Sequence, residues 1–138
     1  MLILDSDHVT EVVRNSAKGK ALIDLLARAG EPMAMTIVSA EEQLRGWLAL
    51  IKKFHDPFRQ IEPYRRLQLM LSMYSEWTVL PWDGVAADKL KELRRRRIRI
   101  GTKDLKIASI VLAHNATLLS RNLGDYSQIS EIRTENWL

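Results

Sequence analysis

The chain has 138 residues, of which 46% are hydrophobic and 28% are charged, and it contains no cysteine. These values predict one globular domain with its own core, and they exclude disulfides, thiolate metal sites and a cysteine nucleophile. The formal net charge of +4 favours a polyanionic partner. Because no apolar run could span a bilayer and the N-terminus lacks the pattern of a signal peptide, we expect a cytoplasmic protein.

The chain opens with a short strand that ends at a carboxylate. Residues Leu2–Leu4 form an apolar run typical of a buried parallel strand, and Asp5 follows it directly. Parallel strands of an open α/β sheet point their carboxyl ends at the crevice where ligands bind, so Asp5 is the first candidate site residue. Asp7 is predicted to cap a helix that begins near His8.

A helix over Ala17–Ala29, a strand over Met33–Val38 and a helix over residues 39–53 follow. The last of these helices carries an apolar stripe at helical spacing, formed by Ala40, Leu44, Trp47, Leu48 and Ile51. Two adjacent acids, Glu41 and Glu42, are expected in its first turn, where the helix dipole favours negative charge.

The second half of the chain continues the alternation. A long amphipathic helix precedes a strand over Trp77–Leu80, and Asp83 is expected to cap a helix that ends in the basic run Arg94–Arg97. A further helix opens at Gly101 and places Asp104 on the same stripe as three apolar residues, Ile107, Ala108 and Val111. Strands over residues 116–120 and 132–134 follow. This pattern predicts an α/β fold with a mostly parallel sheet and helices on both faces.

Three acids fall where such a fold gathers ligands, namely Asp5, Asp104 and Asp125. A glutamate from the third helix would complete a ring of four. Such a ring holds Mg²⁺ or Mn²⁺ through oxygen ligands and leaves coordination positions for water and phosphate. Each acid taken singly is more often a helix cap or a solvated residue, so the constellation depends on all four meeting.

Four motifs resemble those of PIN-domain ribonucleases, in particular the VapC-type toxins of toxin–antitoxin pairs. They are the segments Leu4–His8, Ser39–Gly46, Ile100–Ala108 and Ala116–Tyr126. The closing residues Thr134–Trp137 also resemble the usual end of that family. The resemblance covers the whole chain in the family's order.

The resemblance implies that residues 1–138 form a single PIN-like nuclease domain, a three-layer α/β/α sandwich around a mostly parallel sheet. It implies an endoribonuclease that cleaves single-stranded RNA with Mg²⁺, or with Mn²⁺, through metal-activated water. The implied catalytic and metal-binding acids are Asp5, Glu42, Asp104 and Asp125, and the implied supporting groups are Asp7, Thr102 and Asn122. The spacing to Gly46 selects Glu42, whereas a helical wheel favours Glu41.

The family resemblance also implies a single-stranded or structured RNA substrate, a cognate antitoxin protein and a homodimer. Arg94, Arg95, Arg97 and Arg99 are candidate contacts to RNA phosphates, and the alternative interpretation is a solvated helix end. Part of the segment Trp47–Tyr74 is expected in the core, and the resemblance implies that the remainder forms a groove for an antitoxin helix.

Two other functions compete with this interpretation. The Asp5–Asp7 segment also matches the opening of metal-dependent phosphatases that carry two acids after a strand. A PIN domain that binds RNA or protein without cutting is the second alternative, and loss of one of the four acids would have favoured it.

Overall fold

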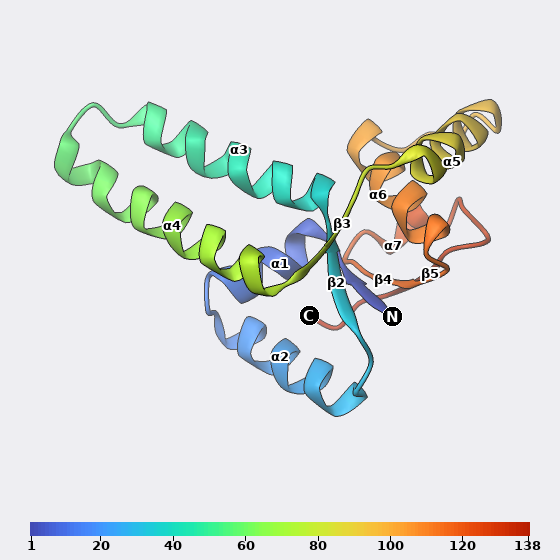
Figure 1. The fold of residues 1–138 in the computed structure, drawn as a ribbon, viewed down its shortest axis with the longest axis horizontal. Coiled ribbons are helices and arrows are strands. Elements are labelled where there is room, and N and C mark those ends of the chain that lie inside the picture. Colours follow the sequence, from blue (N-terminus) through green and yellow to red (C-terminus); the bar gives the residue numbers. More distant parts are fainter.

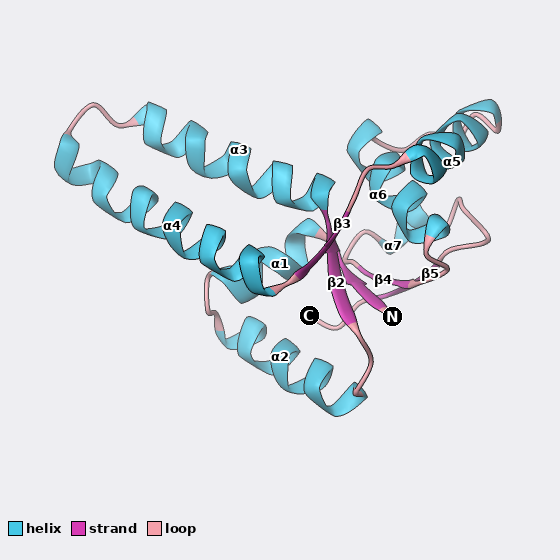
Figure 2. Cartoon of the chain, in the orientation of Figure 1, coloured by secondary structure: helices cyan, strands magenta, loops and turns pink.

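Five parallel strands form the central sheet of the computed structural model, which describes residues 1–138 (Figures 1 and 2). The strands are β1 (Leu2–Leu4), β2 (Met33–Thr36), β3 (Thr78–Leu80), β4 (Thr117–Leu119) and β5 (Arg133–Glu135). Their order in the sheet is β3-β2-β1-β4-β5, and every neighbouring pair is parallel. The strand order therefore reverses between β1 and β4, which is the position where open α/β sheets bind ligands.

Helices cover both faces of this sheet. They are α1 (Ser6–Val13), α2 (Ala17–Ala29), α3 (Ile37–Lys53), α4 (Ile61–Glu76), α5 (Gly84–Arg95), α6 (Thr102–Ala113) and α7 (Leu123–Tyr126), with a short 3₁₀ helix, η1, at Pro57–Gln60. None of these helices is long and apolar enough to cross a bilayer.

Alternate side chains of the strands enter two separate cores, because successive residues of a strand point to opposite faces. Ile3 packs in a core with residues of α5, α6 and α7, whereas Leu2 and Leu4 pack in a core with residues of α1 and α2. The sheet is thus the middle of three layers. The predicted α/β/α sandwich with a parallel sheet is confirmed, and the sheet is parallel throughout.

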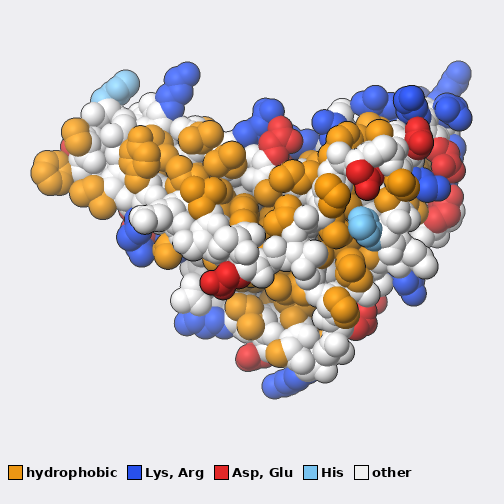
Figure 3. All heavy atoms as spheres, in the orientation of Figure 1, with side chains coloured by type: hydrophobic (Ala, Val, Ile, Leu, Met, Phe, Trp, Pro, Cys, Tyr) orange, Lys and Arg blue, Asp and Glu red, His pale blue; other side chains and the backbone are white.

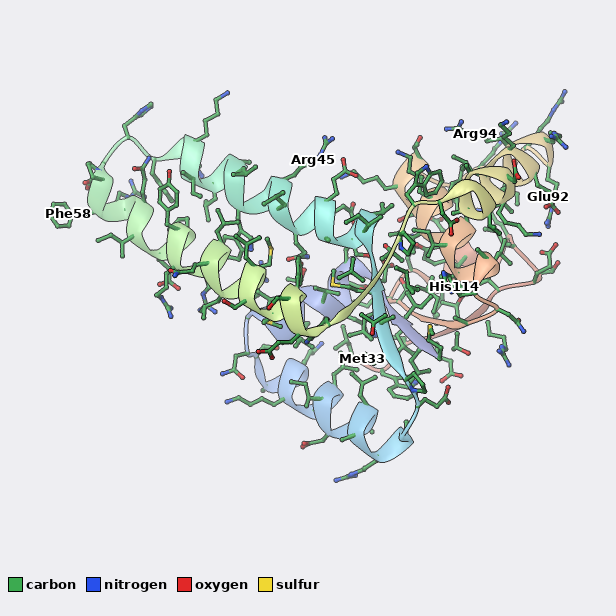
Figure 4. All side chains as sticks on the ribbon, viewed as in Figure 1. Met33, Arg45, Phe58, Glu92, Arg94 and His114 are labelled. Atoms are coloured by element: carbon green, nitrogen blue, oxygen red, sulfur yellow. The ribbon has the colours of Figure 1, made fainter.

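Helices α3 and α4 form a hairpin that projects away from the sheet (Figure 1). Phe58 lies at its tip and points away from the rest of the protein (Figure 4). The apolar stripe of α3 is only partly buried. Ala40 and Ile51 are buried, whereas Leu44 and Leu48 between them are 37% and 49% exposed.

Two helices start earlier than predicted, because side chains that precede the predicted starts act as the N-caps. Helix α1 starts at Ser6, since Asp5 rather than Asp7 is its N-cap and accepts the Ser6 N–H at 2.7 Å. Helix α3 starts at Ile37, because the Thr36 hydroxyl accepts the Ser39 N–H at 3.0 Å. The two glutamates of α3 therefore lie in its second turn rather than its first. The predicted cap at Asp83 is confirmed.

Helices α1 and α2 approach each other closely at Gly19 of α2, which is buried against α1. A Cβ atom built on Gly19 would lie 2.1 Å from the backbone oxygen of Glu11. Gly46 of α3 is the opposite case, since a Cβ there would meet nothing within 4 Å. The packing of α1 on α2 therefore requires a residue without a side chain at position 19.

Candidate active site

Asp5 lies at the reversal of strand order, directly after β1, and is 7% exposed. One carboxylate oxygen accepts the Ser6 N–H at 2.7 Å, and the other accepts the hydroxyl of Ser120, which follows β4, at 2.6 Å. Burial raises the pKa of Asp5 from 3.8 to about 6 against the effect of these hydrogen bonds, and the charges of Asp7 and Asp104 add to the rise. This carboxylate therefore lacks a nearby cation that would offset its burial.

A second pair of acids comes from α6 and α7. The Asn122 side-chain amide donates to Asp125 at 2.9 Å and to Asp104 at 3.4 Å, and the Tyr126 hydroxyl donates to Asp104 at 3.4 Å. Burial, followed by the charges of Glu42 and Asp125, raises the pKa of Asp104. The structure thus brings Asp5, Glu42, Asp104 and Asp125 into one cluster in which the negative charges act on one another. We call these four residues the acidic cluster.

Glu41 and Glu42 point to different surroundings. Glu42 accepts a hydrogen bond from the Ser6 hydroxyl, and its other oxygen lies 3.2 Å from Nζ of Lys103 on α6. Glu41 instead pairs with Arg45 at 2.7 Å, one turn along α3. Figure 4 shows Arg45 pointing outward from α3. The glutamate that the motif spacing selects is therefore the one that lies beside Asp104 and Lys103 in the acidic cluster.

Both carboxylate oxygens of Asp7 are engaged by protein groups. One accepts the His8 N–H at 2.6 Å and lies 2.7 Å from His8 Nδ1, and the other accepts the Arg121 N–H at 2.9 Å. Burial opposes ionisation, but the hydrogen bonds from His8 and Arg121 outweigh it and lower the pKa of Asp7. His8 is fully buried, and its Nε2 accepts the Trp137 N–H at 3.4 Å. Asp7 therefore ties α1 to the segment after β4 and, through His8, to the C-terminal residues.

The remaining sequence-predicted residues contact the acidic cluster unequally. Asn122 bridges Asp104 and Asp125, whereas Thr102 is exposed and makes no side-chain hydrogen bond. Four contacting residues were not predicted from the sequence, namely Lys103 and the three whose hydroxyl groups hold the acids in place, Ser6, Ser120 and Tyr126. The sequence could have indicated all four as candidate site residues, since each lies within one of the four motifs that resemble the PIN-domain family.

The residues of the acidic cluster are chemically suited to a hard divalent cation, because Mg²⁺ and Mn²⁺ prefer carboxylate oxygens. Burial, with a smaller contribution from neighbouring carboxylates, raises the pKa values of Asp5 and Asp104, and a bound cation would offset both effects. In the present side-chain arrangement, no three acidic or histidine side chains are placed to hold a metal ion together. The Lys103 ammonium is instead the cation in contact with Glu42.

Lysine and arginine side chains gather over the outer end of α5 (Figure 3). Arg96 pairs with Glu131 at 2.6 Å and is therefore committed to a contact within the protein. The four arginines predicted to contact RNA, Arg94, Arg95, Arg97 and Arg99, are exposed and form no ion pair. Figure 4 shows Arg94 extending from α5 into solvent.

We compared the sequence and the fold with those of known proteins. No protein-family model matches the chain. A segment of 46 residues is 41% identical to Ribonuclease VapC2 of Rickettsia felis, and this match spans 33% of the chain and 34% of that protein.

Solved structures match over nearly the whole chain. The VapBC2 complex of Rickettsia felis, bound to a DNA fragment from its promoter, aligns with a TM-score of 0.76 and 22% identity over 99% of this chain and 98% of that one. DNA-bound VapBC of Salmonella typhimurium gives a TM-score of 0.75 and 21% identity over the same shares, 99% and 98%. FitAcB of Neisseria gonorrhoeae gives a TM-score of 0.74 and 18% identity, over 99% of this chain and 98% of that one. The predicted resemblance is confirmed: the chain has the VapC-type PIN-domain fold along its length, and about one third of it is similar in sequence to a named VapC ribonuclease.

Proposed function

We propose that this protein is an endoribonuclease that hydrolyses single-stranded RNA with Mg²⁺, and that it is the toxin of a toxin–antitoxin pair. The observation that carries the proposal is the acidic cluster at the reversal of strand order in a fold shared with VapC proteins. The excess of basic residues elsewhere on the chain supports a polyanionic substrate, since the net charge is +4 despite this acidic site.

Asp5, Glu42, Asp104 and Asp125 would hold the metal ion, which when bound neutralises phosphate charge and activates a water for in-line attack. Ser6 and Ser120 keep the Asp5 carboxylate oriented by their hydrogen bonds to its two oxygens. Asn122 holds Asp104 and Asp125 at a fixed separation in the same way. Lys103, already at the edge of the cluster, is positioned to release Glu42 and contact an RNA phosphate.

A cleavage assay on labelled single-stranded RNA tests the proposal and separates it from its competitors. We expect cleavage with Mg²⁺ or Mn²⁺ and none with EDTA. Cleavage that persists in EDTA would contradict the role of the metal. Binding without cleavage would favour a silent PIN domain, and hydrolysis of a phosphomonoester in place of RNA would favour the phosphatase alternative.

Exchanging each glutamate of α3 for glutamine tests the assignment within the site. We expect Glu42→Gln to lower the cleavage rate much more than Glu41→Gln, because Glu42 faces Asp104 and Lys103 whereas Glu41 pairs with Arg45. Since Glu42 is a proposed direct ligand of the metal ion, its loss should exceed the roughly 100-fold upper effect of losing an outer-shell partner. The measurement is the single-turnover rate at saturating Mg²⁺. Equal losses, or a larger loss for Glu41→Gln, would remove Glu42 from the site.

The exposed arginines of α5 and the following turn are expected to act on RNA affinity. Replacing Arg95 and Arg97 with glutamine should flatten the dependence of log K on log salt by about 0.7 per lost phosphate contact. Arg96→Gln is the matched control, since Arg96 is engaged by Glu131 and its removal should leave the slope unchanged. A slope that stays the same in the Arg95/Arg97 double variant would show that these cations only complement the end of α5.

The protein partner belongs to the same proposal. The α3–α4 hairpin exposes apolar side chains along its length, among them Leu48, Ile61 and Phe58, which is 82% exposed (Figure 3). Free proteins rarely leave such a surface uncovered, so it is suited to an antitoxin helix or to a second copy of the chain in the proposed homodimer. The neighbouring VapBC structures are themselves complexes, which supports an antitoxin partner for this chain.

A further inference from the structure

A hollow of about 310 Å³ opens between α3, α6 and the loop after β3. Its lining consists of Ile37, Val38, Glu41, Trp82 and Lys106. Trp82 belongs to the loop that joins β3 to α5, and its side chain is 37% exposed in the absence of any partner. The volume is at the lower end of the roughly 300–1,000 Å³ that is usual for small-ligand sites, which suits a single planar group.

Two helices connect this hollow to the acidic cluster. On α6, Lys103 and Lys106 are three residues apart and therefore lie on the same side of the helix. Lys103 reaches Glu42 at 3.2 Å, and the Lys106 ammonium lies 5.7 Å from the centroid of the Trp82 ring. On α3, Glu41 lines the hollow while its neighbour Glu42 faces the cluster. The hollow is thus adjacent to the acidic cluster, and the two lysines run from one to the other.

We propose that Trp82 and Lys106 form a nucleobase-binding subsite next to the acidic cluster. An unpaired base of the RNA strand stacks on the indole of Trp82, and Lys106 contacts the phosphate next to that base. This inference depends on the proposed function, because it assumes an RNA strand whose scissile phosphate is at the acidic cluster. Trp82 is then a binding residue that sets the register of the strand.

General chemistry of single-strand recognition supports this pairing of residue types. Sites for single-stranded RNA combine cations that follow the backbone with aromatic rings on which bases stack. Trp82 has the largest π-face among side chains, and an adjacent lysine adds a cation–π contact and a phosphate contact. Trp82 is partly open to solvent, unlike the core residues of the same layer, so part of its ring is accessible to a base.

The test measures binding of a short 5′-labelled single-stranded RNA with Mg²⁺ in an Asp5→Asn background, which prevents cleavage. We expect Trp82→Ala to weaken binding by about 5- to 150-fold, the range that corresponds to stacking of one base. Trp82→Phe, which keeps an aromatic face, should recover most of the affinity. The same series is then measured with RNAs that carry one abasic residue at each position in turn. At one position the abasic RNA should bind the parent protein and the Trp82→Ala variant equally, because the base that stacks on the indole is missing.

Two results would overturn the subsite. The first is a loss for Trp82→Ala that is the same at every abasic position, since that would indicate a structural role. The second result applies if Trp82→Ala does not fold, and it is measured on Trp82→Phe. If RNA quenches the tryptophan fluorescence of Trp82→Phe as strongly as that of the parent protein, no base stacks on Trp82. Either result together with Mg²⁺-dependent cleavage by the wild-type protein leaves the proposed function intact. Failure of the wild-type protein to bind or cleave RNA overturns both.

Discussion

Replacing Asp5 with asparagine is expected to abolish RNA cleavage and at the same time to stabilise the fold. The loss of a direct metal ligand should exceed the roughly hundredfold upper effect of losing an outer partner. Asparagine is also a good N-cap, and its amide can accept the Ser6 N–H and donate to the Ser120 hydroxyl, so the hydrogen bonds at this position are kept. What disappears is a buried charge without a cation.

The gain in stability from Asp5→Asn should increase with pH, because the pKa of Asp5 is higher in the folded than in the unfolded state. Burial raises this pKa from 3.8 to about 6, so the folded state binds the proton more tightly than the unfolded state does. The wild-type protein therefore loses stability as pH rises from about 4 through 6, and the full loss is present at pH 7. The difference between the two pKa values corresponds to about 3 kcal/mol, which is an upper value for the gain from Asp5→Asn.

Urea unfolding of both proteins in EDTA, at pH 4 and at pH 7, measures this difference in the free energy of unfolding. The asparagine variant should be more stable by about 1–3 kcal/mol at pH 7 and nearly equal to the wild type at pH 4. Added Mg²⁺ should narrow the gap at pH 7, because the metal ion stabilises only the protein that binds it well. A variant that is less stable than the wild type at pH 7 would show that the Asp5 charge is already compensated.

Replacing Gly19 with alanine is expected to destabilise the fold, because the close packing of α1 on α2 leaves no room for a side chain. The new methyl group would overlap the backbone oxygen of Glu11, which belongs to α1 and cannot rotate away as a side chain can. Helices α1 and α2 would have to separate, and with them the core formed by Leu2, Leu4 and Leu22. Overpacking of this kind costs about 1–3 kcal/mol, and more where backbone must move.

Gly46→Ala is the matched control, since the same substitution in α3 meets nothing within 4 Å. There alanine should be neutral or stabilising by up to about 1 kcal/mol, because it has the higher helix propensity. Urea midpoints of the two variants, compared with the wild type at equal m-values, measure both effects. If Gly19→Ala were as stable as Gly46→Ala, the close packing of α1 on α2 would be wrong.

The parts of the fold that depend on local sequence were predictable. Residues Ala17–Ala29 form α2 with the predicted ends, because Ser16 and Gly30 provide caps at both termini. The start of α3 was missed, since the hydroxyl of Thr36 competes with that of Ser39 and the sequence does not show which one a strand end will expose. The sequence left open which residues of the Trp47–Tyr74 segment are buried, because an apolar stripe does not reveal whether its helix lies on the sheet or projects from it. Leu48 is exposed.

The sequence identified the acids of the candidate site, but it did not predict their contacts with the surrounding residues. Motif spacing pointed to Glu42, but its contacts with Ser6 and Lys103 depend on how α3 and α6 pack against α1. The hydrogen bond between Ser120 and Asp5 joins residues 115 positions apart, and no local pattern encodes such a contact. The role predicted for Asp7 in capping α1 was wrong for a similar reason, because Asp7 is engaged by Arg121 from the far end of the chain.

The position of β1 in the middle of the sheet has a consequence for synthesis of the protein. β1 leaves the ribosome well before its neighbour β4 and the partner of Asp5, which follow 115 residues later in the chain. A nascent chain that ends before β4 therefore has one open edge on β1 and lacks Asp125 and the Ser120 hydroxyl. Contacts so distant in sequence also form late in folding. The acidic cluster, and with it the proposed cleavage of RNA, is thus complete only after residues 120–125 have been synthesised.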